Sequence, residues 1–278
     1  MTVADKVHQS IDTMTRAERM AATALLATYP LLGLRTVAEF AAEAGVSSPT
    51  VLRFVDRLGF ANYPSFQQEL HVELADQLKS PLDKAGSPQA RPLTELSRTI
   101  VGNIESTMAS IPERELEEVI ESLGDPRHPV FTTGGRFTDA LARHLASHLQ
   151  LMRPNVRHIE RDADSRRDQL IDVPRDSRIV CFDIRRYDPS LTAFAARAAQ
   201  RGAQIVLFTD QWISPAAHSA RHVFPGRVEV PSIWDSLTSL MVLVDTVLAG
   251  VARTRWDETT ARLSDLEELR RAVDPDAP

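Results

Sequence analysis

Hydroxyl and arginine side chains recur at short intervals in VSSPTVLRFVDRLGF, residues 46–60. Arginine can form paired hydrogen bonds with guanine edges or hold phosphates, and hydroxyls near a helix start can meet phosphate or base edges in the major groove. At helical spacing the side chains on the outer side are Ser48, Thr50, Arg53 and Arg57. Their chemistry is that of a helix that recognises DNA.

The elements that must position these side chains form a helix-turn-helix between residues 36 and 60. Val37, Phe40, Ala41 and Ala44 recur at i, i+3, i+4 and i+7, which places one apolar stripe on a short first helix. Gly45 follows where a tight turn needs positive φ or a missing Cβ.

The second helix starts at about Ser48, because Ser47 is a preferred N-cap and Pro49 is tolerated in a first helical turn. Its inward positions and its closing residue are Val51, Phe54, Val55, Leu58 and Gly59. The alternative is an ordinary helical hairpin with solvated arginines. The agreement of alanine, glycine and apolar positions along the whole motif favours the DNA-binding interpretation.

Composition and length limit the classes of protein to consider. A chain of 278 residues predicts about two domains, and the net charge of −6 argues against a nonspecific nucleic-acid coat protein. Cys181 is the single cysteine, so no internal disulfide can form, and the scattered histidines lack metal-ligand spacing. We expect a cytoplasmic protein with no membrane span, no metal and no cofactor.

The order of elements predicts a helical domain followed by an α/β domain. A capping box at residues 15–18 opens a helix that ends near Tyr29-Pro30, and residues 64–78 complete the helix-turn-helix domain, residues 1–79. Residues 80–92, SPLDKAGSPQARP, form a linker.

Short apolar runs alternate with helical patterns in the second domain, residues 93–278, after two helices at about 93–108 and 113–123. The runs are VFTTG, VRHIE, RIVCFDI and QIVLFTD, which read as strands of a doubly wound parallel sheet. Ligands of such sheets bind at the carboxyl ends of the strands. A long helix at 231–255 and another at 257–273 are expected to serve both the core and a partner.

This order of parts resembles RpiR-type transcriptional regulators, which join an N-terminal helix-turn-helix to a C-terminal sugar isomerase (SIS) domain. The segment from Val37 to Leu70 carries the likeness, with a Val-Ser start of the recognition helix, the Leu58-Gly59-Phe60 step and Tyr63-Pro64. The resemblance implies a DNA-facing role for Ser47, Thr50, Arg53 and Arg57.

In such domains a glycine-rich turn after the first strand and a serine-rich loop after the third hold a sugar phosphate. The first turn here keeps Gly134, Gly135, Arg136 and Thr138 at a helix opening, an arrangement that can bind an anion, although the glycines could also form only a turn.

The second loop departs from the family pattern, because DIRRYD replaces the hydroxyl donors by charge. Arg185 and Arg186, with Arg136 across the cleft, could bind an anion in bidentate fashion. Alternatively, they pair with Asp183 and Asp188 as a surface network. The expected ligand residues on this side are Asp183, Arg185, Arg186 and Thr209. Trp212 would cover the sheet, and Asp235 and Ser236 would cap a helix.

The leading hypothesis is a homodimeric or homotetrameric regulator that binds a double-stranded DNA operator and senses a small anionic metabolite, a sugar phosphate or sugar acid. One alternative is a sugar-phosphate isomerase, for which His144 and His148 are weak candidates for a general base. Another is a scaffold with a degenerate pocket. We expect no enzymatic activity and no catalytic residue.

Overall fold

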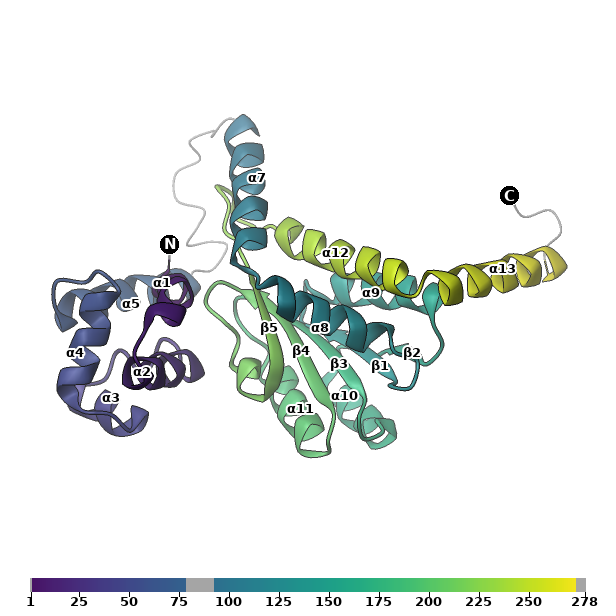
Figure 1. Ribbon diagram of the computed structural model, residues 1–278. Coiled ribbons are helices and arrows are strands. Elements are labelled where there is room, and N and C mark those ends of the chain that lie inside the picture. Colours follow the sequence, from purple (N-terminus) through teal and green to yellow (C-terminus); the bar gives the residue numbers. More distant parts are fainter. Residues whose placement is uncertain (1, 79–92, 274–278) are drawn as a thin grey trace.

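The computed structural model describes residues 2–78 and 93–273, which form a helical N-terminal body and an α/β body (Figure 1). The predicted linker, residues 80–92, lies outside the described residues. No helix in the described part of the chain combines the length and apolarity that crossing a membrane requires.

The N-terminal body contains five α-helices around one apolar core. They are α1 (Val3–Ser10), α2 (Arg16–Ala27), α3 (Val37–Ala44), α4 (Ser48–Arg57) and α5 (Tyr63–Leu78), with a short 3-10 turn η1 (Ile11–Thr13) after α1. Phe40, Phe54 and Phe66 are fully buried in this core. The predicted helix-turn-helix is therefore present with its expected bounds, whereas α1 was not predicted.

Threonine capping boxes start three of these helices. Thr2, Thr15 and Thr36 each accept a hydrogen bond from the backbone three residues later, and the acidic side chain there returns a bond. Such reciprocal bonds satisfy N–H groups that a helix start leaves free. The capping box at Thr15 confirms the predicted start of α2.

The α/β body is built on one parallel sheet in the order β2-β1-β3-β4-β5. The strands are β1 (Val130–Gly134), β2 (Val156–His158), β3 (Arg178–Asp183), β4 (Gln204–Asp210) and β5 (Ala220–Gly226). Val180 and Phe182 belong to the core under α8, α9 and α12, whereas Ile179 and Cys181 belong to the core on the α11 side. Burial on both faces confirms the doubly wound prediction.

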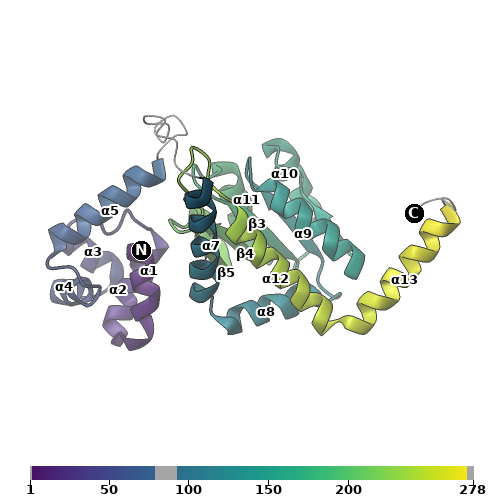
Figure 2. The same ribbon diagram turned by 90° about the horizontal axis from the view of Figure 1, so that it is seen from above.

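Helices connect and cover these strands. They are α7 (Leu93–Ser110), α8 (Glu113–Gly124), α9 (Asp139–Met152), α10 (Ala163–Gln169), α11 (Pro189–Gln200), α12 (Thr238–Thr254) and α13 (Trp256–Val273), with short 3-10 turns η2 (Leu170–Asp172) and η3 (Pro215–Ser219). In both views of the ribbon, α13 extends away from the sheet (Figures 1 and 2).

Two sequence predictions about the end of the sheet were wrong. The edge strand β5 was missed, because its sequence ARHVFPG mixes polar residues with a proline that only an edge strand tolerates. The helix predicted from Pro231 begins only at Thr238. Residues 227–237 instead form a connection, here called the β5–α12 loop, in which Ser232 and Ser236 donate backbone hydrogen bonds to neighbouring loop carbonyls.

The β5–α12 loop also touches the N-terminal body. The guanidinium of Arg227 forms an ion pair with Asp5 of α1, and the Arg227 backbone N–H donates to Thr107 of α7. One loop of the α/β body is thus joined to the first helix of the helix-turn-helix body.

Candidate functional site

The turn before α4 sets which face of this helix packs against the N-terminal core and which face is exposed. Gly45 adopts the left-handed conformation at φ 65°, and its N–H donates to the carbonyls of Ala41 and Ala42. A residue with a Cβ is strained there. Val51, Phe54, Val55 and Leu58 pack inward as predicted, which leaves Ser47, Leu52, Arg53, Asp56 and Arg57 exposed.

The expected outward orientation of Thr50 is wrong. Its side chain is only 5% exposed, because it stands one turn before Phe54 on the inner stripe of α4. The Thr50 hydroxyl lies 2.9 Å from Ser47 Oγ and accepts a hydrogen bond of 3.3 Å from Arg53 Nη2. Ser47 occupies the N-cap position, as predicted, but its side chain makes no capping hydrogen bond. The buried hydroxyl of Thr50 therefore positions the exposed side chains of Ser47 and Arg53.

The two arginines of α4 differ in their surroundings. Arg57 Nε lies 3.3 Å from the buried carboxylate of Glu18 in α2, and Arg57 Nη1 donates to the Thr13 carbonyl. Burial raises the pKa of Glu18, but hydrogen bonds from Thr15 and Arg57 outweigh it and keep this pKa below its ordinary value. Arg53 forms no ion pair with a described residue, so its charge is available to a partner.

Leu52 is a surface residue that the sequence analysis missed. It is 46% exposed, next to Arg53 on the outer face of α4. An exposed leucine at the centre of a recognition helix can contact a thymine methyl group. The signal was available in the sequence, because Leu52 falls outside the inward stripe of Val51, Phe54 and Val55.

The glycine-rich turn after β1 is stabilised by close packing and by hydrogen bonds within the protein. A Cβ on Gly134 would come within 2.6 Å of the Asp139 backbone, so glycine is required by close approach. Gly135 N–H donates both to the Phe182 carbonyl and to Thr138 Oγ1, and Thr138 Oγ1 donates to the Phe182 carbonyl. The amide and hydroxyl predicted to bind an anion are already engaged in joining β1 to β3.

Exposed side chains mark the mouth of the site above this turn. Arg136 and Phe137 are exposed, with the guanidinium carbon 5.3 Å from the ring centroid. The Phe137 ring meets the exposed Trp234 of the β5–α12 loop edge-on, at 6.3 Å between centroids. Arg186, in the left-handed region at φ 59°, is also exposed. These groups offer two cations and an aromatic pair to an incoming molecule.

Arg185, in contrast, is buried and already faces anions. Its Nε lies 3.1 Å from Asp235 and its Nη2 3.8 Å from Glu229, both from the β5–α12 loop. Its guanidinium carbon stands 4.2 Å over the ring of the buried Trp212. The predicted pairing of Arg185 with Asp183 or Asp188 was wrong, as was the capping role of Asp235, because this loop folds over the strand ends.

Two buried carboxyl groups organise the floor of the site. Asp210 accepts hydrogen bonds from the Arg185 and Trp212 backbone and from the Tyr187 hydroxyl. Asp183 accepts from the Ser214 hydroxyl at 2.5 Å and from the Asp188 N–H. Burial raises the pKa of Asp183 to about 7 and that of Asp210 to about 6. Thr209, a predicted ligand residue, is fully buried, and its hydroxyl donates to the Asp183 carbonyl. Its side chain therefore serves an internal contact.

The sequence analysis missed Arg166, a fully buried cation beneath the site. Its guanidinium donates to the Gly134 carbonyl, to Ser190 Oγ and to Asp188, with 2.9 Å between Nη1 and the carboxylate. Burial raises the pKa of Asp188, but the hydrogen bonds from Arg166 and Ser190 outweigh it and lower this pKa. In the sequence Arg166 lies in a polar helix among other charges, so nothing distinguished it.

Comparisons with known proteins agree with this arrangement. Residues 1–77 match the family model described as helix-turn-helix domain, rpiR family, and residues 125–250 match the SIS domain. An uncharacterized HTH-type transcriptional regulator of Haemophilus influenzae is 29% identical over 131 residues, 45% of this chain and 46% of that protein. The chain thus spans about half the length of this curated relative.

Two solved structures share the fold. The sugar isomerase domain of an RpiR transcription factor from Sphaerobacter thermophilus is 21% identical, with a TM-score of 0.57 over 63% of this chain and 97% of that one. The Vibrio vulnificus NanR protein complexed with ManNAc-6P is 15% identical, with a TM-score of 0.55 over 98% and 99% of the two chains. With its matching helix-turn-helix and SIS domains, the chain belongs to the RpiR family.

Proposed function

We propose that this protein is a DNA-binding transcriptional regulator whose SIS domain senses a small anionic metabolite, of which a sugar phosphate is the favoured class. The observation that supports DNA recognition is the exposed face of α4, where Arg53 carries a positive charge that no described carboxylate pairs with. Ser47 and Ser48 add hydroxyl groups at the helix start, and Arg57 adds charge at its end. These residues are the proposed DNA contacts.

The observation that supports anion sensing is the buried Arg185. The loop carboxylates Asp235 and Glu229 neutralise it, as a phosphate or carboxylate ligand would. A ligand anion that takes their place, with Arg136 and Arg186 at the mouth, would displace the β5–α12 loop. The proposed sensing step is therefore an exchange of one anion for another at Arg185. NanR is bound to a sugar phosphate in its solved complex.

The β5–α12 loop also supports a route from ligand to DNA. Glu229 and Asp235 of this loop contact Arg185, and Arg227 of the same loop pairs with Asp5 in α1. Displacement of the loop carboxylates would alter the contact that orients the helix-turn-helix body. A ligand shifts an equilibrium only by binding one arrangement better than another. In this proposal the two arrangements differ in the position of the β5–α12 loop.

A sensing role fits these residues better than isomerase activity. Isomerisation needs a positioned general base. His144 lies 3.3 Å from Asp245 on α12, and the tilted ring of His148 has its centroid 4.3 Å from that of His144, so both belong to the outer side of α9. His158 contacts Thr132 Oγ1 and Asp139, and burial lowers its pKa. Within the described residues, these histidines are committed to structural contacts.

The test begins with DNA that the full-length protein selects from a random duplex library. Arg53→Ala should lower affinity for the selected duplex by at least tenfold without changing the circular dichroism spectrum, because it removes a charged base or phosphate contact. Arg114→Ala, an exposed arginine on α8, is the matched control and should bind like the wild type. Equal affinity of the wild type and Arg53→Ala would refute the proposed recognition surface.

The sensing half of the proposal is tested by thermal shift against phosphosugars, sugar acids and dicarboxylates. A ligand should raise Tm, and the rise should vanish in the Arg136→Gln/Arg185→Gln double variant. The melting curve of this variant without ligand is the reference from which its own shift is measured. If no anion in these three classes raises Tm, the sensing proposal fails while the DNA-binding proposal stands.

A further inference from the structure

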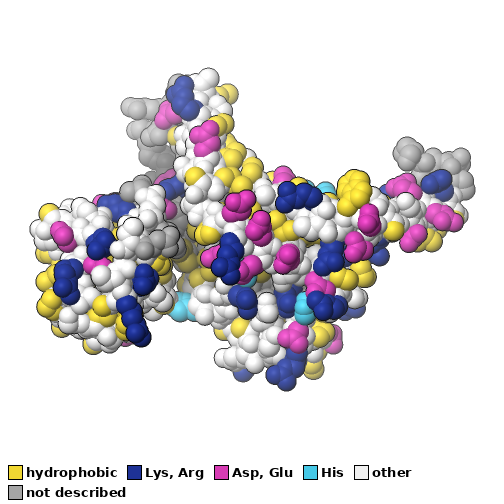
Figure 3. Space-filling view, in the orientation of Figure 1, with side chains coloured by type: hydrophobic (Ala, Val, Ile, Leu, Met, Phe, Trp, Pro, Cys, Tyr) yellow, Lys and Arg dark blue, Asp and Glu magenta, His cyan; other side chains and the backbone are white. Residues whose placement is uncertain are grey.

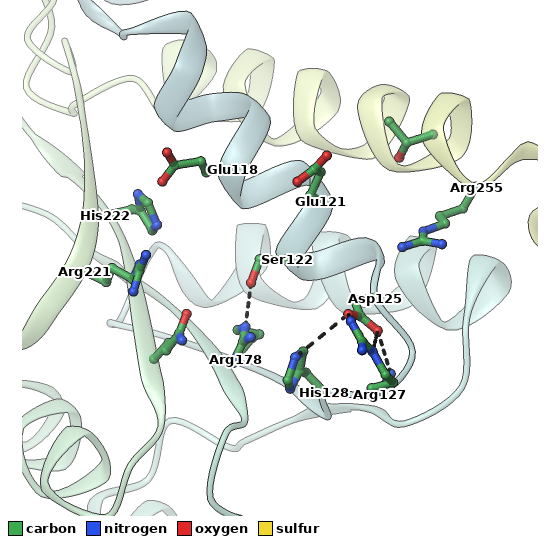
Figure 4. A pocket seen from close by; sticks show the side chains of 12 residues that line it. Glu118, Glu121, Ser122, Asp125, Arg127, His128, Arg178, Arg221, His222 and Arg255 are labelled. Atoms are coloured by element: carbon green, nitrogen blue, oxygen red, sulfur yellow. Dashed lines mark hydrogen bonds and ion pairs between the residues drawn. The ribbon is translucent and has the colours of Figure 1, made fainter.

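We propose that a second site, at the opposite edge of the sheet, binds a small phosphorylated molecule that also carries hydroxyl groups. The site is a cavity of about 570 Å³ between α8, the amino ends of β3, β4 and β5, and the end of α12 (Figure 4). We call it the amino-edge cavity. Its volume lies within the range of small-molecule sites.

The floor of the amino-edge cavity is a row of polar side chains on adjacent strands. Arg178 pairs in register with Gln204, and His222 follows on the next strand. These three residues lie on the same face of the sheet as Val180, Val206 and Phe224, which belong to the core under α8 and α12. The apolar rows therefore end at this edge in hydrogen-bonding groups that line one cavity.

Arg178 carries the strongest evidence for an anion. It is 7% exposed, its Nε donates to Ser122 Oγ at 2.5 Å, and its Nη1 donates to the Asp176 carbonyl. No described carboxylate lies within ion-pair distance of its guanidinium. Burial lowers the pKa of Arg178, because moving a cation out of water is costly, and the carboxylates of Asp176 and Asp125, beyond ion-pair distance, offset this cost only in part. An anion in the cavity would offset that cost at the remaining nitrogen, Nη2.

A second arginine approaches the same space. Arg221 is exposed on β5 and likewise has no described ion-pair partner, and its charge contributes to the lowered pKa of Arg178. Arg127, by comparison, is neutralised by Asp125 through hydrogen bonds of 2.5 to 3.0 Å. Two guanidinium groups that form no ion pair with a described carboxylate thus line the same cavity. A phosphate there can accept hydrogen bonds from Arg178 Nη2 and from the exposed guanidinium of Arg221.

The facing wall indicates that the ligand also carries hydroxyl groups. Glu118 and Glu121 of α8 line the cavity above the arginine row (Figure 4). Carboxylates repel a phosphate but accept hydrogen bonds from hydroxyls. Acidic and basic side chains are also interspersed over this face in the space-filling view (Figure 3). A sugar phosphate or a nucleoside monophosphate combines both chemistries.

The experiment is calorimetric titration of the full-length protein at constant ionic strength with inorganic phosphate, glucose 6-phosphate and adenosine 5′-monophosphate. Arg221→Gln should weaken binding of the phosphorylated probe about tenfold, the usual value of one charge-assisted hydrogen bond. Arg253→Gln removes a charge from α12 outside the cavity and should change nothing. Arg136→Gln, at the other edge, should also leave this binding event intact.

The outcomes separate this site from the one at the carboxyl ends of the strands. The proposal is overturned if Arg221→Gln binds as tightly as the wild type, or if binding is lost in Arg136→Gln instead. It is also overturned if glucose 6-phosphate and the nucleotide both bind no tighter than inorganic phosphate. Preference for one of the two identifies the source of the phosphate. Arg178→Gln, checked for folding by circular dichroism, should show the same loss as Arg221→Gln.

Discussion

At the scale of single residues, the carboxyl ends of the strands are governed by charges that are buried together. Asp183, Asp210 and Arg185 lie within one network of loop hydrogen bonds. Burial favours the protonated form of a carboxyl group, and neighbouring carboxylates add to that effect. The ionisation of Asp183 therefore costs the folded protein stability near neutral pH.

This cost predicts a pH dependence that Asp183→Asn removes. The pKa of Asp183 is raised from 3.8 to about 7, so the folded state binds the proton more tightly, and its stabilising effect is lost as pH rises from about 4 to about 7. Asparagine can accept from the Asp188 N–H through its carbonyl oxygen and donate from its amide nitrogen to Ser214 Oγ. At pH 8 the variant should be more stable by an amount on the order of 4 kcal/mol, and at pH 4 the difference should disappear.

Chemical denaturation at several pH values measures this difference. Asp164→Asn, an exposed residue of α10, is the control and should follow the wild type at each pH. A constant difference in stability between Asp183→Asn and the wild type from pH 4 to pH 8 would contradict the assignment.

A second residue-scale prediction concerns Thr50. Because its buried hydroxyl accepts a hydrogen bond from Arg53, Thr50→Val should weaken binding to the selected duplex by about three- to tenfold while keeping the packing of α4. Gel shift and melting temperature together measure the two effects. A fall in stability large enough to account for the lost binding would assign Thr50 to the core alone.

At the scale of elements, local sequence signals correctly located helices whose ends are set by their own residues. The capping boxes of α2 and α3 and the Gly45 turn have short-range causes, so they were legible in the sequence. The edge strand β5 and the start of α12 have long-range causes, because they depend on pairing with β4 and on the folding of the β5–α12 loop over Arg185.

The local cause at Gly45 makes a quantitative prediction. Gly45→Ala should destabilise the N-terminal body by about 1 kcal/mol, because alanine is strained at φ 65°. Gly102→Ala in α7 is a matched control, since a Cβ there meets nothing within 4 Å and alanine favours a helix. In urea denaturation the changes in unfolding free energy of the two variants should have opposite signs. A stabilising Gly45→Ala would show that the turn accommodates a Cβ without strain.

At the scale of the whole molecule, the β5–α12 loop is the element that touches both bodies. Arg227→Gln should uncouple them, because it removes the ion pair with Asp5 but keeps the backbone bond to Thr107. The ligand found by thermal shift should bind the variant as it binds the wild type. Its effect on DNA affinity should shrink from the range of 5- to 150-fold typical of coupled sites to less than about threefold.

Fluorescence anisotropy with the selected duplex, with and without ligand, measures that ratio. Asp265→Asn in α13 leaves the loop untouched and should respond to ligand like the wild type. A full response in Arg227→Gln would mean that coupling between the bodies follows another path.

The amino-acid sequence alone was enough for the two-domain order, the helix-turn-helix and four of the five strands, because apolar periodicity, caps and turn glycines act over a few residues. It also located Arg53 on the outer side of α4 and Arg185 at a strand end. Folding in three dimensions settled which charges meet. The pairs are separated by 22, 50 and 222 residues in the chain: Arg166 with Asp188, Arg185 with Asp235, and Arg227 with Asp5. Such pairings follow only from the packing of distant segments.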